Sequence, residues 1–127
     1  GTVNYGVQAS ANDIIMMALD LTSATSKIWW GKNGTWFNAP STSNAGNPAT
    51  GAYAGLSFAK GDEFWGINVT SVANSGNQYM YCNFGRGCFG TTAVSSGNAD
   101  GNSQGIFEYA VPSGFYAICT KNIKSYG

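Results

Sequence analysis

An Asn-Gly pair, Asn33-Gly34, places the strongest constraint on how this chain can fold. It separates two aromatic runs, Lys27–Lys32 and Thr35–Asn38. Both residues accept the positive φ values that a two-residue β-hairpin turn demands, and an Asn-Gly pair between apolar strands is the strongest short hairpin signal. The sequence therefore predicts an antiparallel hairpin with Asn33 and Gly34 as its turn.

The register of this hairpin sorts three of the four tryptophans onto two faces. A two-residue turn places Trp30 opposite Phe37, and side chains alternate between the faces along each strand. Ile28, Trp30 and Phe37 therefore share one face of the hairpin. Trp29 and Trp36 share the other face.

Charge limits the classes of function that this chain can have. Only 9 % of its 127 residues are charged, six basic and six acidic, whereas about a quarter is usual in soluble domains. A neutral chain with a single arginine, Arg86, lacks the positive surface that nucleic acid binding requires. The longest apolar run, Ile14–Leu19, is too short to span a bilayer, so we expect no membrane insertion. The length predicts one domain over residues 1–127.

Short apolar runs separated by Gly, Asn and Ser predict an all-β fold. The run Asp13–Leu21 is apolar on both alternations, as in a strand covered on both faces. A helix is the alternative there, but the short run and the turn after it favour a strand. A long loop is expected over Ala39–Gly55. Strands at short spacing without helices indicate an antiparallel two-sheet β-sandwich, with further strands expected at Glu63–Val69, Gln78–Phe84, Gly105–Tyr109 and Phe115–Cys119.

Four separate blocks carry a resemblance to a known family. They are "NDIIMMALDLTSATSKIWWGKNGTWF", "GNPATG", "NFGRGCF" and "FEYAVPSGFYAICTKN". In order and approximate spacing, these blocks resemble the C-terminal portion of a SPRY domain of the type found in tailed-phage structural proteins. The resemblance implies a concanavalin-like sandwich and a binding or scaffolding role without catalysis. Because several strands precede the first block in the family, we expect a fragment or a domain completed by another chain.

The resemblance also implies which face of the hairpin is internal. In the family, the face that carries Ile28 points between the two sheets. The predicted core is therefore made of Ile28, Trp30, Phe37, Phe84, Phe107 and Tyr109.

Trp29 and Trp36 lie on the opposite face, so something other than the second sheet must bury them. One alternative is that the loop Ala39–Gly51 or the C-terminal tail covers them within the chain. The other is that they form a contact surface, because aromatic residues are enriched at interface hot spots. We predict that a neighbouring chain buries this face in the working assembly.

Catalytic and metal-binding chemistry find little support in the sequence. The chain has no histidine, which excludes catalytic triads and metal sites that depend on an imidazole. Its acidic residues fall in predicted turns or on solvated strand faces. The segment Ser95–Gly105 has one carboxylate, Asp100, whereas calcium needs about 6–8 oxygen ligands. We expect an Asx-rich turn there, and no enzyme activity, cofactor or metal.

The sequence leaves open whether two of the cysteines form a disulfide. Cys82 and Cys88 flank "NFGRG", a spacing that is compatible with the short Cα separation of a disulfide. The odd number of cysteines argues against a disulfide framework. Cys119 follows an apolar alternation and is expected to be a buried free thiol.

Two classes of function are compatible with these features. The first is a non-enzymatic structural or assembly module of a virion, a capsid-decoration or tail-associated protein that contacts other virion proteins or copies of itself. The second is a receptor- or glycan-recognition module, in which Trp29, Trp36 and Tyr53 would stack against sugar rings of a host surface. We favour the first, because stacking aromatics alone do not define a sugar site.

Overall fold

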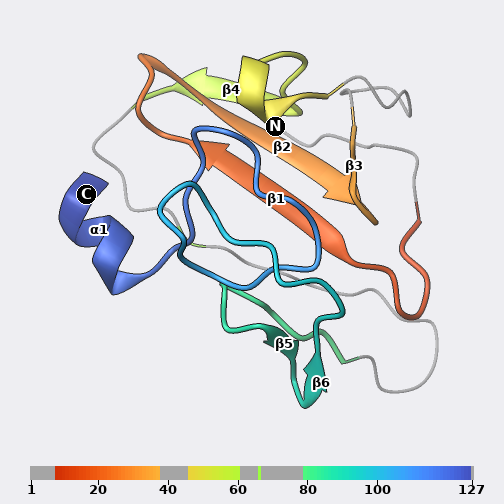
Figure 1. The fold of residues 1–127 in the computed structure, drawn as a ribbon. Helices are drawn as coiled ribbons and strands as arrows, with labels where there is room; N and C mark the ends of the chain where they lie inside the picture. The colour runs from red at the N-terminus through yellow and green to blue at the C-terminus, as the bar shows by residue number, and fades with distance from the viewer. Residues whose placement is uncertain (1–7, 38–45, 61–65, 67–78, 127) are drawn as a thin grey trace.

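The computed structural model describes residues 8–37, 46–60, 66 and 79–126. Most of the regular structure in this part of the chain is β-strand (Figure 1). The strands are β1 (Ile15–Asp20), β2 (Thr25–Lys32), β3 (Thr35–Trp36), β4 (Leu56–Ala59), β5 (Cys88–Phe89) and β6 (Thr92–Ala93). A short 3-10 helix, η1 (Pro48–Thr50), and a seven-residue α-helix, α1 (Thr120–Tyr126), complete the regular elements. The prediction of a mostly β, antiparallel protein is confirmed.

Strand β2 is the central element of a four-stranded antiparallel sheet. Strand β1 runs along one edge of β2, with Ala18 opposite Trp29. Strands β3 and β4 share the other edge, because β3 pairs with Gly31 and Lys32 while β4 pairs with residues 25–28. Strands β5 and β6 form a separate two-stranded sheet. The aromatic and β-branched residues of β2 favour this pleated, two-sided environment.

The predicted hairpin is confirmed at its turn and in its register. Gly31 lies opposite Trp36, and the Phe37 N–H donates to the Trp30 carbonyl at 2.9 Å. Asn33 has φ 49° and Gly34 has φ 86°, the pair of positive values that the type I′ turn needs.

Strand β1 is confirmed within the run that predicted it, whereas η1, β4, β5, β6 and α1 were not predicted. Strand β4 and helix α1 are the longest of these. Strand β4 follows immediately after the stretch expected to be a long loop and pairs with β2 over four residues. Helix α1 covers the mostly polar run "TKNIKSY". Both are too short to give a clear periodicity, so their formation depends on the surfaces that they meet.

Three further segments expected to be strands lack strand structure in the described part of the chain: residues 79–84, Gly105–Tyr109 and Phe115–Cys119. Asparagine and aspartate side chains bind backbone groups in or beside these segments. Examples are Asn83 Nδ2 to the Ile106 carbonyl at 3.0 Å, Asn98 Nδ2 to the Glu108 carbonyl at 2.9 Å, and the Ala117 N–H to Asp100 Oδ2 at 2.9 Å.

Such side-chain bonds compete with strand ladders for the same backbone groups. The segments therefore run as ordered loops, with one isolated bridge between Asn98 and Phe107. The strand predicted at Glu63–Val69 lies outside the described residues apart from Gly66.

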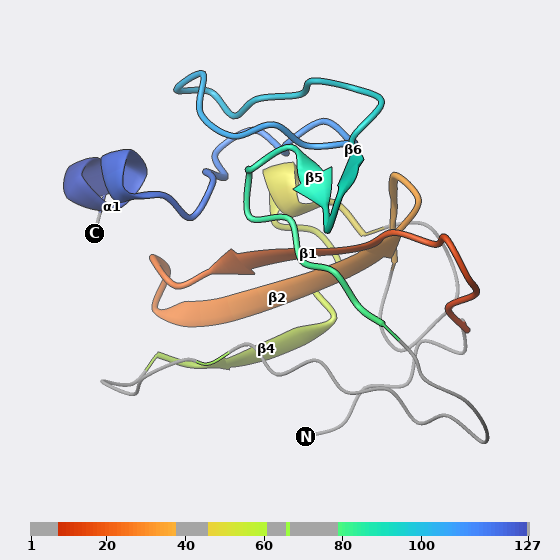
Figure 2. The same cartoon turned by 90° about the horizontal axis from the view of Figure 1, so that it is seen from below.

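Trp29 lies at the centre of the packed core. Its side chain is 1 % exposed, its Nε1 donates to the Ala52 carbonyl at 2.8 Å, and the Phe115 ring meets it edge-on at 5.8 Å between centroids. Loops from the C-terminal half pass in front of β1 (Figure 1) and lie to one side of the sheet (Figure 2). The prediction that a neighbouring chain buries Trp29 is therefore wrong. The loop before β4 and the C-terminal segment cover it instead.

The core implied by the family resemblance is only partly found. Phe37 is buried, whereas Ile28 and Trp30 are half-buried. Placing Phe84 in the core is wrong, because its side chain is 51 % exposed on the loop that Asn83 organises.

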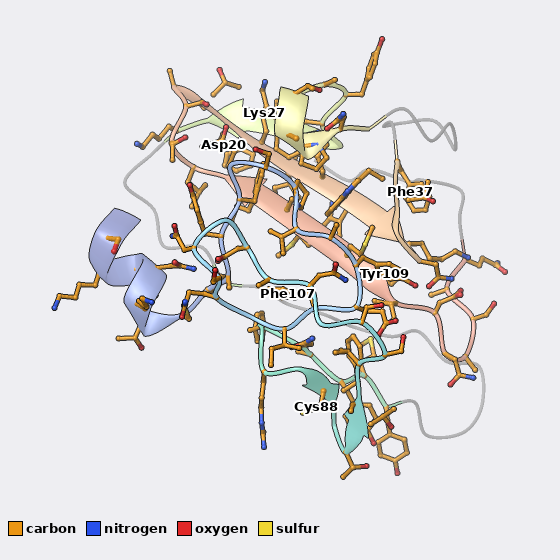
Figure 3. The ribbon with its side chains drawn as sticks, in the orientation of Figure 1. Asp20, Lys27, Phe37, Cys88, Phe107 and Tyr109 are labelled. Carbon is orange, nitrogen blue, oxygen red and sulfur yellow. The ribbon has the colours of Figure 1, made fainter. Side chains whose placement is uncertain are left out.

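Phe107 and Tyr109 are half-buried in the loops that pass in front of β1 (Figure 3). The Tyr109 ring packs against the turn at Gly34, where an added Cβ would lie 3.0 Å from Tyr109 Cδ1. The C-terminal half of the chain is thereby packed on the hairpin turn.

Trp29→Ala should lower the free energy of unfolding by about 3–5 kcal/mol, the usual range for truncating a large buried aromatic side chain. It removes the largest fully buried side chain among the described residues and its hydrogen bond to Ala52. Urea unfolding followed by far-UV circular dichroism measures the change. The matched control is Tyr53→Ala, at a 61 % exposed position, which should change stability by less than about 0.5 kcal/mol. Equal effects of the two changes would contradict the placement of Trp29.

Gly34→Val should cost roughly 1–3 kcal/mol, because a β-branched residue is strained at positive φ. Its Cβ would also press on the Tyr109 ring. Thermal unfolding measures the loss of stability. Gly97→Val is the matched control, since no atom lies within 4 Å of a Cβ added there. A melting temperature equal to that of the parent would show that the turn is assigned wrongly.

Candidate functional site

The structure separates the three aromatic residues predicted to form a contact surface. Trp29 is buried, and Trp36 is half-buried on the same face, with its ring against Gly31. Tyr53 is the one member of this predicted set with a largely exposed side chain, at 61 %. The three residues therefore do not form one accessible surface.

Tyr53 projects from a loop that is fixed by several hydrogen bonds. Asn47 and Ala52 exchange two backbone hydrogen bonds of 3.0 Å, and Lys27 Nζ donates to the Gly51 carbonyl at 3.4 Å. Tyr53 has φ 50°, which is unfavourable for a large side chain. Non-glycine residues in this conformation concentrate at functional sites, where the surrounding structure holds them in place. An exposed, rigidly held tyrosine is thus available for contact.

A second group of exposed side chains was missed at the level of sequence. We call it the aromatic surface: Tyr79, Met80, Tyr81, Phe84 and Ile106, with exposed fractions of 73, 49, 59, 51 and 47 %. The sequence signal is the run "YMYCNF" at 79–84. The run predicts a strand, in which successive side chains would point to opposite faces and every second one would be buried.

Hydrogen bonds around Asn83 bring Ile106 beside the loop that carries Phe84. Asn83 Oδ1 accepts from the N–H groups of Gly85 at 2.9 Å and Gly87 at 3.2 Å. The Ile106 N–H donates to the Gly85 carbonyl at 3.0 Å, which brings Ile106 beside the loop that carries Phe84. Gly85 and Gly87 have φ values of 105° and 86°, so this loop needs glycine at both positions.

Glycines also set how two of these side chains lie. The Tyr81 ring rests on Gly90, where an added Cβ would be 2.9 Å from Tyr81 Cδ1. Ile106 rests in the same way on Gly87. Tyr81 and Ile106 are therefore held in place, although their side chains remain accessible.

Arg86 adds a cation to this region. It lies on the same loop, two residues after Phe84, and is exposed. Within the described residues the one ion pair joins Lys32 to Asp13, so Arg86 has no carboxylate partner there. Aromatic residues, methionine and arginine are the types enriched in protein–protein interfaces.

Acidic side chains in the described ranges are held by local hydrogen bonds. Asp13 binds Lys32 and Asn33, and Asp20 binds the hydroxyls of Thr22 and Ser23 at the β1–β2 turn (Figure 3). This turn role confirms the interpretation of Asp20. Asp62 and Glu63 lie outside the described residues.

Glu108 is bound to Ser95, through both the backbone N–H and the hydroxyl of that serine. Those two bonds lower the pKa of Glu108. Its carboxylate is thus held by the loop that carries Ser95.

Asp100 organises the segment that superficially resembles a calcium loop. It is 7 % exposed and accepts hydrogen bonds from the N–H groups of Asn102, Gln104 and Ala117 and from Asn122 Nδ2, all between 2.7 and 2.9 Å. Burial opposes its ionisation, but these bonds outweigh that cost and lower its pKa. The interpretation as an Asx turn is confirmed. The turn also anchors α1, because Asn122 is 4 % exposed and belongs to that helix.

The three cysteines are free thiols, so the disulfide considered between Cys82 and Cys88 is not formed. Cys119 is free as predicted, but it is half-buried rather than buried. No group of three or more cysteine or acidic residues in the described ranges is placed to hold a metal ion. Across the same ranges, none of the helices has the length and apolar character to cross a membrane.

Comparison with known proteins gives no match among family models, curated proteins or solved structures. The resemblance to SPRY domains therefore rests on the sequence blocks themselves and stays a prediction.

Acidification should destabilise the fold below about pH 4. The pKa of Asp13 is lowered to about 2, chiefly by the Ser10 N–H and then by Asn33 and Lys32. The pKa values of Asp20, Asp100 and Glu108 are lowered as well. Groups with a lowered folded pKa contribute stability that is complete above their unfolded values and is lost as the pH falls through the folded values. Melting temperatures measured between pH 8 and pH 2 should be flat at first and then fall.

Asp100→Asn is the informative variant for this acid transition. It should be less stable than the parent at neutral pH, because one carboxylate oxygen becomes an amide that cannot accept a hydrogen bond. Its acid loss should be smaller, since one titrating group is gone. A parent melting temperature that rises on acidification would contradict the pKa directions.

Proposed function

We propose that this chain is a non-enzymatic binding module that works through protein–protein contacts as a structural or assembly part of a virion. The observation that carries the proposal is the aromatic surface, which is exposed and largely apolar, with Phe84 on a loop that Asn83 holds in place. Apolar side chains grouped in this way on a preorganised loop suit burial against another protein. The low charge of the chain fits the same use, because interface cores are depleted in charged residues.

The proposed fold is a SPRY-like, concanavalin-like β-sandwich, and the sequence blocks support it. In that arrangement the four-stranded sheet would be one of two layers, with any missing strands supplied by the rest of a longer protein or by a neighbouring chain. The proposed location is the extracellular virion particle, on the capsid or the tail. Its proposed partners are other virion proteins or copies of the same chain.

Met80 and Ile106 favour a protein partner over a sugar at the aromatic surface. Both are exposed and apolar, and neither can bind the hydroxyl groups that cover a saccharide. A protein can bury them together with Phe84. The truncation of such anchors usually costs far more binding energy than the truncation of the residues around them.

Tyr53 supports the second candidate function, recognition of a receptor or glycan. It is an exposed aromatic ring on a fixed loop in an unfavourable backbone conformation. A ring presented in this way can stack on the apolar face of a sugar. With Trp29 buried and Trp36 half-buried, such a site would depend on Tyr53 rather than on the three aromatics together.

The test compares one double substitution with one single control substitution, in the soluble chain and in the assembled particle. Phe84→Ser with Tyr79→Ser should leave the melting temperature close to that of the parent, because both side chains are more than half exposed. Incorporation into particles and self-association in sedimentation experiments should fall by tenfold or more, the scale of losing a hot spot of about 2 kcal/mol. Tyr53→Ser is the matched control and should assemble normally.

A different outcome would favour receptor or glycan recognition through Tyr53. If Tyr53→Ser abolishes binding on a glycan array while the double variant still assembles, recognition is the function and the aromatic surface is not its site. A particle structure in which the aromatic surface faces solvent would overturn the assembly proposal.

A further inference from the structure

Asn33 combines a reactive sequence with a restrained side chain. It is the one asparagine in the chain that glycine follows. Its Oδ1 accepts from the Ile14 N–H at 2.8 Å, and its Nδ2 donates to Asp13 Oδ1 at 2.7 Å. Both bonds tie the hairpin turn to the segment that leads into β1.

Asp13 is itself held from several directions. Its Oδ2 accepts from Lys32 Nζ at 3.1 Å and from the Ser10 N–H at 2.8 Å. Lys32 also reaches the Gln8 carbonyl at 3.2 Å. We call this set of contacts among Asp13, Ile14, Lys32 and Asn33 the turn clamp.

An asparagine followed by glycine can modify itself without an enzyme. The Gly34 nitrogen would attack Cγ of Asn33 and form a five-membered succinimide, while the Cγ–Nδ2 bond breaks and ammonia leaves with the proton of the former Gly34 N–H. Water then opens the ring to an aspartyl or an isoaspartyl residue. Glycine favours the attack because no Cβ shields its nitrogen.

We propose that Asn33 is a spontaneous deamidation site whose rate is controlled by the turn clamp. Cyclisation requires Cγ of Asn33 to swing onto the Gly34 nitrogen. The bonds from its amide to Asp13 and Ile14 oppose this movement. The reaction proceeds when the segment around Asp13 opens. The fraction of molecules deamidated at Asn33 therefore increases with the age of the protein.

Deamidation would also prevent the clamp from closing again. The new carboxylate would replace an amide donor that lies 2.7 Å from Asp13 Oδ1, and two carboxylates at such a distance cannot both stay ionised without a large cost. In the isoaspartyl product the backbone gains an extra carbon within the turn. Either product would loosen residues 10–14 from the β2–β3 turn.

The rate of conversion at neutral pH tests the proposal, measured as the mass shift of the tryptic peptide that begins at Asn33. Asp13→Ala should deamidate about tenfold faster than the parent, or more, the scale expected for losing a hydrogen bond to a charged group. Asp20→Ala is the matched control. It also removes a turn carboxylate bound to local donors, but at the opposite end of β1, and its rate should stay within about twofold of the parent.

A second measurement needs no variant. The folded parent should deamidate at least about tenfold more slowly than the same chain in urea, because unfolding removes both restraining bonds. Equal rates for the folded and unfolded chain would overturn the proposal, as would equal rates for Asp13→Ala and Asp20→Ala. These outcomes are independent of whether the aromatic surface binds a protein.

Discussion

The hydrogen bond from the Trp29 indole to the Ala52 carbonyl lies where the main parts of the described chain meet. The ring belongs to the central strand β2, the carbonyl belongs to the loop before β4, and Phe115 of the C-terminal segment closes over the ring. A large aromatic side chain with one polar atom can bury its surface and still have its N–H satisfied. Residues distant in sequence are thereby fixed around one side chain.

Polar side chains organise the C-terminal half as strongly as apolar packing organises the sheet. Asn83, Asn98 and Asp100 bind backbone groups that strands would otherwise use. Each bond is modest by itself, but an unsatisfied buried backbone group is expensive, so the loops adopt the conformation in which these groups are paired. This accounts for an ordered region with little regular structure. It also explains why the glycines beside Asn83 hold positive φ values.

The same loops decide which side chains are available to a partner. Turning the chain at Asn83 directs Phe84 outward, whereas a continuous strand would have alternated it with buried neighbours. The exposure of Tyr53 has a different cause. Its backbone conformation is held by the loop that the bridge between Asn47 and Ala52 closes. Both surfaces are therefore products of loop geometry. A binding role is consistent with this, because loops on a rigid scaffold commonly carry function.

The sequence by itself determined the hairpin, its register and strand β1, because the turn residues and the side-chain alternation are local signals. It also separated Trp29 from Trp30 onto opposite faces. Which face is covered was decided by the tertiary structure, since burial depends on segments 20 to 90 residues away in the chain, such as Ala52 and Phe115. For the same reason Phe84 was predicted to be internal and is exposed. The local pattern determines which side chains share a face of a strand. Contacts with distant segments decide which of the two faces is buried and which is exposed to solvent.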